Sequence, residues 1–262
     1  MTRAKRHYIP GHAWHLTHRC HKRDFLLKFP KDRRRWIEWL FQSKKRYGLT
    51  ILNYMVTSNH IHLLVFDNDG KNIIPDSIKL TAGRTGQEYN IRKKRKGAFW
   101  EDRYHATAVE TNQHLIRCIV YIDLNMVRAG VVEHPSEWEF CGYNEIQNPK
   151  KKKGIIDFEI LMNLLEIENW NTLKKVHNEW VDNALSCNNN VRESHWTQSI
   201  AVGSKDFTEK VITELGHRAK GRTIIGNGDM FQVRENQGEY GNNNYSIDNT
   251  FAWDQNSSDN YR

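Results

Sequence analysis

The sequence predicts an α+β fold in which a small antiparallel sheet carries helices on one face. Four segments of strand character occur before residue 110, and the first of them, at residues 14–19, alternates between apolar and polar residues. Segments with apolar residues at helical spacing separate or follow these strands. The resulting order, βαββαβα, favours a ferredoxin-like layer of sheet and helices.

The strands are expected at residues 14–19, 49–56, 61–66 and 98–109. The second and third form a β-hairpin, because only the short turn at residues 57–59 separates them. A helix is expected after the Pro30-Lys31-Asp32 run, with apolar residues at helical spacing from Trp36 to Tyr47, and two more are expected at residues 73–91 and 112–128. Gly48 and Gly130 lie where helix-stop residues are common, and Thr111 is a suitable N-cap for the last helix.

We expect a first domain at residues 1–148, and the composition of the rest of the chain indicates three further segments. A lysine-rich run at residues 149–154 has the character of a linker, and residues 155–225 show helical patterns. Residues 226–262 are rich in Asn, Gly, Ser and Asp and poor in aliphatic side chains, so we expect a disordered tail there. The mean hydropathy of −0.77 agrees with a chain that is only partly buried.

The net charge of +8 is unevenly distributed. Residues 1–154 hold 29 Lys and Arg against 15 Asp and Glu, which leaves +14, whereas residues 155–262 hold 10 against 16, which leaves −6. A basic half is the electrostatic signature of a nucleic-acid binder, because neutralising phosphates releases condensed counterions. The same charges also suit a solvated surface, so charge alone leaves both interpretations open.

The four cysteines are far apart and lack the C-x-x-C pattern, which argues against a zinc site and against a disulfide framework. No apolar run approaches the roughly 20 residues of a membrane span. The basic N-terminus has no apolar core of the kind a signal peptide needs. We therefore expect a soluble, intracellular protein.

His60 and His62 are the first candidate functional pair. Residues two apart on a strand point to the same face, so both imidazoles are expected to project together. Two neighbouring neutral imidazoles can bind a divalent metal. Taken alone, the pattern fits two buried, hydrogen-bonded structural histidines at least as well.

Tyr121 and Asn125 are four residues apart on the expected helix at 112–128 and therefore share one of its faces. Asn125 offers an oxygen that a hard cation accepts, and Tyr121 offers a phenolic nucleophile. Because a tyrosine has a pKa of about 10, it needs a metal or a base to attack a phosphate. A half-buried aromatic side chain on an amphipathic helix is the structural alternative.

Four segments carry a resemblance to a known family: YIPGHAWHLT (8–17), MVTSNHIHLL (55–64), FWEDRY (99–104) and YIDLNMVRAG (121–130). In this order they resemble the HUH single-tyrosine transposases of the IS200-like superfamily, and among them the REP-associated tyrosine transposases of bacteria. The resemblance extends over about residues 7–144. Met126 departs from it, because the family usually has proline there; this changes no expected ligand.

The resemblance implies a metal-dependent enzyme in which His60, His62 and Asn125 hold Mg²⁺ or Mn²⁺ and Tyr121 is the nucleophile. Such an enzyme cleaves and rejoins single-stranded DNA through a 5′-phosphotyrosine, acting on hairpins of palindromic repeats. It would work in the bacterial cytoplasm at the nucleoid, as a monomer or a homodimer. Basic residues expected to contact the DNA are Arg92, Lys93, Lys94, Arg95, Lys96, Arg103 and Arg128.

Two other functions stay open. One is a DNA-hairpin-binding protein that has lost the chemistry, and the other is a relaxase or replication initiator with the same kind of site. Tyr104 is the rival nucleophile, although its place on the expected fourth strand favours packing or base stacking. Glu101, Asp102 and Asp123 are candidates for a further metal oxygen, and their spacing selects none of them.

Overall fold

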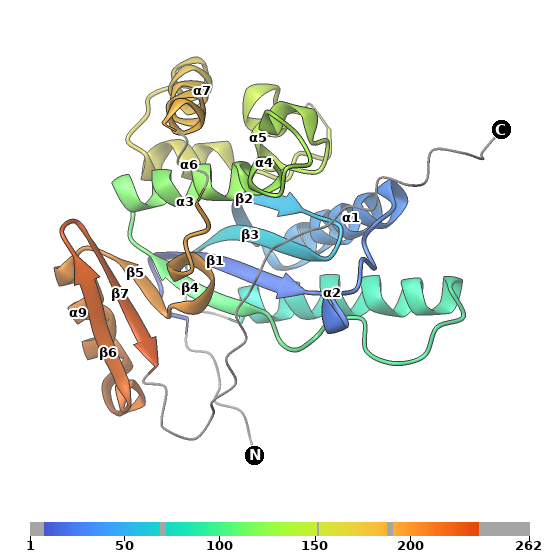
Figure 1. The fold of residues 1–262 in the computed structure, drawn as a ribbon, viewed down its shortest axis with the longest axis horizontal. Coiled ribbons are helices and arrows are strands. Elements are labelled where there is room, and N and C mark those ends of the chain that lie inside the picture. Colours follow the sequence, from blue (N-terminus) through green and yellow to red (C-terminus); the bar gives the residue numbers. More distant parts are fainter. Residues whose placement is uncertain (1–7, 69–71, 151, 188–190, 236–262) are drawn as a thin grey trace.

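The computed structural model describes residues 8–68, 72–150, 152–187 and 191–235. They form a seven-stranded sheet with the order β2-β3-β1-β4-β5-β7-β6 (Figure 1). Neighbouring strands are antiparallel except β4 and β5, which are parallel. The strands are β1 (His12–Arg19), β2 (Thr50–Val56), β3 (His60–Asp67), β4 (His105–Val109), β5 (Ala201–Gly203), β6 (Arg222–Asn227) and β7 (Met230–Glu235). The α-helices are α1 (Pro30–Tyr47), α2 (Ile73–Arg92), α3 (Gln113–Asp123), α4 (Asn125–Arg128), α5 (Gly142–Gln147), α6 (Phe158–Leu164), α7 (Trp170–Ser186), α8 (His195–Gln198) and α9 (Lys205–Leu215), and short 3₁₀ turns occur at His21–Arg23, Pro135–Glu137 and Gly216–Ala219.

Strands β1 to β4 confirm the predicted antiparallel sheet, and β2 and β3 form the predicted hairpin. β3 lies between β2 and β1, so that His62 is opposite Met55 on one side and Thr17 on the other. Gly48 ends α1 as predicted, with a φ of 73° that a residue without Cβ adopts at no steric cost.

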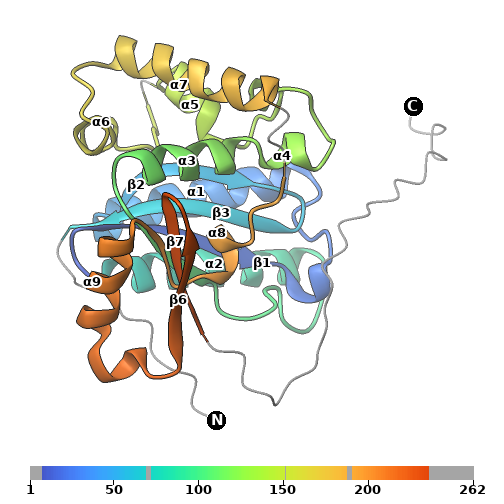
Figure 2. The ribbon, with the colours of Figure 1, turned by 60° about the vertical axis from the view of Figure 1, so that its left-hand side comes forward.

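Helices cover both faces of this sheet, which corrects the prediction that they share one face. His15 and His18 on β1 are three residues apart and point to opposite faces. The His15 ring lies 6.2 Å from the ring of Tyr121 on α3, between centroids. The His18 ring stacks on Trp100, whose indole donates a hydrogen bond to the carbonyl of Ala82 on α2. α1 packs beside α2, so α1 and α2 lie opposite α3 (Figure 2). The apolar stripe of a helix does not reveal which face it covers.

β4 is shorter than the predicted strand at 98–109 and begins only at His105. Residues 98–104 form a loop instead. Trp100 in this loop makes an isolated bridge with Cys20, and Phe99 beside it is 4% exposed. The aromatic side chains that suggested a strand therefore attach the loop to the core.

The helix predicted at 112–128 divides at Leu124 into α3 and α4. Asn112 precedes α3, not the predicted cap Thr111, and its side chain makes no capping bond. The amide of Leu124 still bonds to the carbonyl four residues earlier, at 3.0 Å. The helical spacing therefore persists through the break, and Tyr121 and Asn125 stay one turn apart.

The C-terminal region differs most from the prediction, because residues 155–225 are only partly helical and residues 226–235 are ordered. β5 pairs with β4, and the β6–β7 hairpin extends the sheet beyond it (Figure 1). Gly228 has a φ of 59° in the turn of this hairpin. The start of the segment that was expected to be disordered therefore forms a tight turn. The rest of the expected tail, residues 236–262, lies outside the described residues.

A layer made of α5, α6 and α7 covers α3 on the side away from the sheet (Figure 2). The carboxylate of Glu145 on α5 accepts the backbone N–H groups of Ile155 and Ile156 at 2.6 and 2.8 Å. The residues that directly follow the expected linker, Ile155 and Ile156, are therefore buried and hydrogen-bonded to α5. Within the described ranges, no helix has both the length and the apolar character needed to cross a membrane.

Candidate active site

A cleft of about 710 Å³ lies where the end of β1 and the start of β3 meet α4, the loop before β4 and the segment around α8. His60, His62, Tyr121 and Asn125 all line it. The structure therefore brings together the four residues that the sequence selected from two separate motifs.

His60 is held with one ring nitrogen toward the protein. Its Nδ1 lies 2.7 Å from the amide oxygen of Asn59 and 2.9 Å from the hydroxyl of Thr57. Because the amide oxygen only accepts, Nδ1 carries the proton. Burial lowers the pKa of His60 to about 3, so the ring is neutral and its Nε2 has a free lone pair.

His62 is the more deeply buried of the pair, at 2% exposure. Its ring centroid lies 5.0 Å from that of His60. Burial holds the pKa of His62 well below its ordinary value, with His15 and His60 adding to the effect. The Nε2 of His62 contacts the side-chain nitrogen of Asn125 at 3.0 Å, and its Nδ1 contacts His15 at 2.8 Å.

Tyr121 packs in an aromatic and basic environment at the back of the cleft. Its ring lies 6.0 Å from His62 and 6.1 Å from Trp196, between centroids. The guanidinium carbon of Arg128 lies 4.1 Å from its ring centroid. Burial raises the pKa of Tyr121, whereas the positive charges of Arg128 and Arg192 lower it. The two arginines therefore favour the phenolate against the effect of burial.

The donor set suits a small divalent cation with open coordination positions. Two neutral imidazoles and an asparagine side chain line one cleft wall. Within the described ranges, no three His, Cys, Asp or Glu side chains gather into a metal cage. Glu101 and Asp102 line the same cleft and offer nearby carboxylates. Asp123 is excluded as a metal ligand, because it is fully buried and pairs with His177 instead.

Five arginines line the cleft: Arg19, Arg23, Arg103, Arg128 and Arg192. Arg103 and Arg128 were among the predicted DNA contacts. The predicted cluster Arg92–Lys96 is not part of the cleft lining, and Arg92 there forms an ion pair with the buried carboxylate of Asp32. Arg192 lies far in sequence from the other cleft arginines, and its segment carries no motif. A search for sequence patterns therefore could not select it.

Tyr104 and Tyr54, two further tyrosines of the first half of the chain, have structural roles. Tyr104 is 8% exposed and its hydroxyl accepts a hydrogen bond from Tyr8 at 2.7 Å. Tyr54 is 1% exposed and donates to Glu145 at 3.1 Å. Neither lines the cleft.

Comparison with known proteins finds a family that resembles residues 9–125. Residues 9–125 match the family model described as IS200-like transposase. This part of the chain is similar to the IS200-like transposases. The matched residues end at Asn125, so they include the histidine pair and Tyr121.

Two solved structures are also similar to this chain. One is a REP-associated tyrosine transposase bound to a REP hairpin, with 19% identity, a TM-score of 0.48, and coverage of 60% of this chain and 95% of that chain. Another, from Deinococcus radiodurans, is provisionally assigned as a transposase, with 18% identity, a TM-score of 0.33, and coverage of 42% and 87%. No curated protein matches the sequence.

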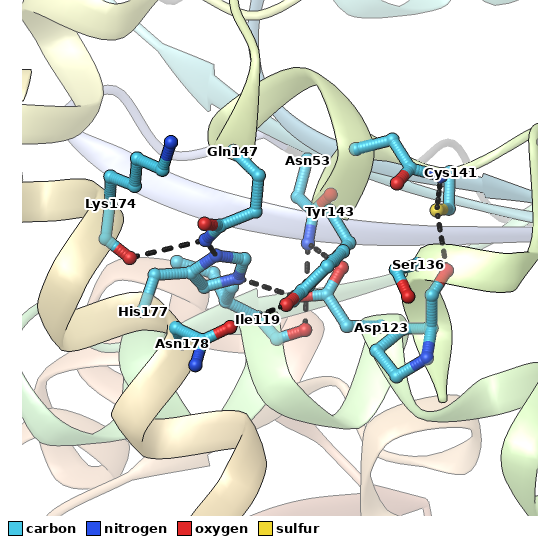
Figure 3. A network of polar contacts seen from close by, with 12 residues as sticks. Asn53, Ile119, Asp123, Ser136, Cys141, Tyr143, Gln147, Lys174, His177 and Asn178 are labelled. Atoms are coloured by element: carbon cyan, nitrogen blue, oxygen red, sulfur yellow. Dashed lines mark hydrogen bonds and ion pairs between the residues drawn. The ribbon is translucent and has the colours of Figure 1, made fainter. Parts of the chain in front are cut away.

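Behind the cleft, a buried polar network ties α3, which carries Tyr121, to α7 (Figure 3). The carboxylate of Asp123 accepts a hydrogen bond from His177 at 2.8 Å and another from Asn53 at 3.0 Å. The side-chain amide of Gln147 lies 3.0 Å from the second nitrogen of His177. Asp123 and His177 are both 0% exposed. The network therefore holds β2, α3, α5 and α7 together two residues from Tyr121.

We expect His177→Leu to lower the free energy of unfolding by about 3 kcal/mol, because the Asp123 carboxylate would stay buried with a donor missing. Urea denaturation followed by circular dichroism measures this change. His217→Leu, on an exposed histidine, is the control and should change stability by less than about 0.5 kcal/mol. Equal stability of the two variants would contradict a structural role for the network.

We expect the metal-free protein to lose stability as the pH falls from about 6.5. Burial lowers the pKa of His15 to about 3 in the folded chain, whereas an unfolded histidine takes up a proton near pH 6.5. Between these values the unfolded state binds the extra proton, so stability decreases by up to about 1.4 kcal/mol per pH unit for this group. Urea unfolding between pH 7 and 5 measures the slope. His15→Gln should reduce the slope by about one proton, and an unchanged slope would contradict the assignment.

Proposed function

We propose that this chain cleaves and rejoins single-stranded DNA through a covalent bond between Tyr121 and a 5′-phosphate. The observation that carries the proposal is the position of Tyr121 in one arginine-lined cleft with two neutral, inward-facing histidines. The family match of residues 9–125 supports a transposase-type reaction on DNA. A protein that acts on DNA in this way would work at the nucleoid.

In the proposed reaction the phenolic oxygen of Tyr121 attacks a backbone phosphorus. A P–O bond to the tyrosine forms as the P–O3′ bond breaks, and the leaving 3′-oxygen takes up a proton. The energy of the phosphodiester is kept in the phosphotyrosine, so a 3′-hydroxyl can reverse the step without ATP. Such a reaction needs a stabilised phenolate and a neutralised phosphate.

The arginines provide the charge that this chemistry needs. Arg128 lies over the Tyr121 ring, and Arg192 adds positive potential to the same side chain. A guanidinium also pairs well with phosphate oxygens. Removal of either charge would make the phenolate less stable.

His60, His62 and Asn125 would hold Mg²⁺ or Mn²⁺. When bound, such an ion polarises the phosphate and stabilises the charge that develops on its oxygens. The two histidines are suited to this because both are neutral at physiological pH. Asn125 would contribute its side-chain oxygen.

Single-stranded DNA, presented by a hairpin of palindromic repeats, is the proposed substrate. The cleft combines arginines with Phe25, whose ring is 48% exposed and lines the same cavity. An exposed aromatic face beside basic residues suits an unpaired base, and stacking of this kind contributes about 1–3 kcal/mol per base. The hairpin itself is proposed from the resemblance of the four sequence segments.

A covalent-capture assay on the full chain tests this function. Hairpin oligonucleotides made from repeats flanking the gene are incubated with Mg²⁺ or Mn²⁺ and analysed on denaturing gels. A 5′-phosphotyrosine predicts that a label on the 3′ end moves with the protein, whereas a label on the 5′ end is released on a shorter fragment. Binding without any covalent product would instead support the non-catalytic alternative, and capture of the 5′-labelled fragment would reverse the proposed polarity.

A further inference from the structure

A buried hydrogen-bonded series connects the cleft to the C-terminal region. His15 on β1 is 0% exposed and lies between His62 of β3 and Trp196 of α8. Its Nε2 is 2.8 Å from the Nδ1 of His62, and its Nδ1 is 2.9 Å from the carbonyl oxygen of Trp196. The two rings are nearly coplanar, with 11° between their planes and 5.0 Å between their centroids, as an in-plane hydrogen bond between ring nitrogens requires.

The carbonyl of Trp196 decides the direction of this series. A carbonyl oxygen only accepts, so His15 carries its proton on Nδ1. His15 is fully buried, and its ring nitrogens contact a carbonyl oxygen and a second imidazole, neither of which carries the negative charge that would stabilise an imidazolium, so the ring is neutral and its other nitrogen is unprotonated. The Nε2 of His15 is therefore an acceptor, and the proton between the two rings belongs to Nδ1 of His62.

This assignment leaves the Nε2 of His62 with a lone pair. The same nitrogen lies 3.0 Å from the side-chain nitrogen of Asn125, which donates a hydrogen bond to such a lone pair. Asn125, His62, His15 and Trp196 thus form a one-directional series of donors and acceptors. The Trp196 end fixes the proton position on His62, and the Asn125 contact agrees with it when the side-chain amide presents its nitrogen.

The acceptor at the end of the series is well fixed. Trp196 is 0% exposed, and its indole donates to the carboxylate of Glu193 at 2.7 Å. The α8 helix is a single turn, so its carbonyls have few helical partners. The carbonyl of Trp196 also accepts the hydroxyl of Thr107 at 3.2 Å. It is therefore held in place by β4.

We infer that Trp196 and His15 are positioning residues that fix the tautomer of His62, so that its Nε2 faces the cleft unprotonated. They act through His62 and contact no reacting atom. The consequence for metal binding rests on the proposed function. The candidate site accordingly takes one determinant from a segment about 70 residues beyond the last residue of the family match.

Imidazole NMR of the metal-free full chain tests the tautomers directly. Long-range ¹H–¹⁵N correlation spectra of histidine-labelled protein report which ring nitrogen carries the proton. We expect Nδ1 protonated and Nε2 unprotonated for both His15 and His62, with signals assigned by single substitution. A proton on Nε2 of either ring at neutral pH would overturn the inference. This readout needs no cleavage, so it stands or fails separately from the role of Tyr121.

Mn²⁺ affinity of the full chain, measured by calorimetry, tests the consequence. We expect His15→Phe to weaken Mn²⁺ binding about 10–100-fold, the range for groups that orient a metal-bound histidine. His15→Gln keeps an acceptor oxygen near the position of Nε2 and should bind close to the wild type. His12→Phe, a buried histidine on the same strand outside the cleft, is the matched control. Equal losses in the Gln and Phe variants, or no loss in the folded Phe variant, would reject the positioning role; if His15→Phe fails to fold, the NMR result on the wild type decides.

Discussion

Tyr121→Phe abolishes covalent capture of single-stranded DNA while leaving hairpin binding close to that of the wild-type chain. The phenylalanine ring can keep the packing against Trp196 and the contact with Arg128. Only the hydroxyl is lost, and with it the atom that attacks phosphorus. Loss of a nucleophile typically lowers the rate by several orders of magnitude. Denaturing gels measure capture, and fluorescence anisotropy on the same hairpin measures binding.

Tyr104→Phe is the matched control for this substitution. It removes a hydroxyl that accepts a hydrogen bond from Tyr8 and lies outside the cleft lining. We expect normal capture by this variant, with a small loss of stability. Capture by Tyr121→Phe at the wild-type rate would remove Tyr121 from its proposed role.

The second large effect is expected from His60→Ala and His62→Ala. Each variant removes one of the two imidazoles that would hold the metal. We expect Mn²⁺ affinity and cleavage to fall by at least about 100-fold, the upper end of the effect of groups that only orient a ligand. Hairpin binding should change little, because the cleft arginines remain. Calorimetry with Mn²⁺ and the capture assay measure the two losses.

His114→Ala is the control for the histidine variants, since His114 lies on α3 and does not line the cleft. Chelation by EDTA should stop cleavage by the wild type, and added Mg²⁺ should restore it. Normal cutting with Mg²⁺ by both histidine variants would show that the metal is held elsewhere or is not needed.

Local patterns were sufficient to place four residues of the candidate cleft in two pairs. Strand alternation placed His60 and His62 on one face, and helical spacing placed Tyr121 one turn from Asn125, even though the helix breaks at Leu124. Both patterns depend only on the geometry of one element. That two such elements meet in one cleft came from the resemblance to a family, not from spacing.

Contacts between distant segments could not be read from local patterns. His15 was considered only against His18, whereas its partners are 47 and 181 positions away. Arg192 lies in a segment without periodicity, and β5 has only three residues, too few to show alternation. The choice of sheet face for each helix is likewise a tertiary property, so the expectation of helices on one face was wrong.

Mapping of the covalent adduct by mass spectrometry tests the central claim most directly. The full chain is captured on a hairpin oligonucleotide, treated with nuclease and protease, and searched for the peptide that carries a nucleotide through its 5′-phosphate. The proposed mechanism predicts a single modified peptide, with the linkage at Tyr121 and none in the Tyr121→Phe variant. A linkage at Tyr104 or at any other side chain would contradict it.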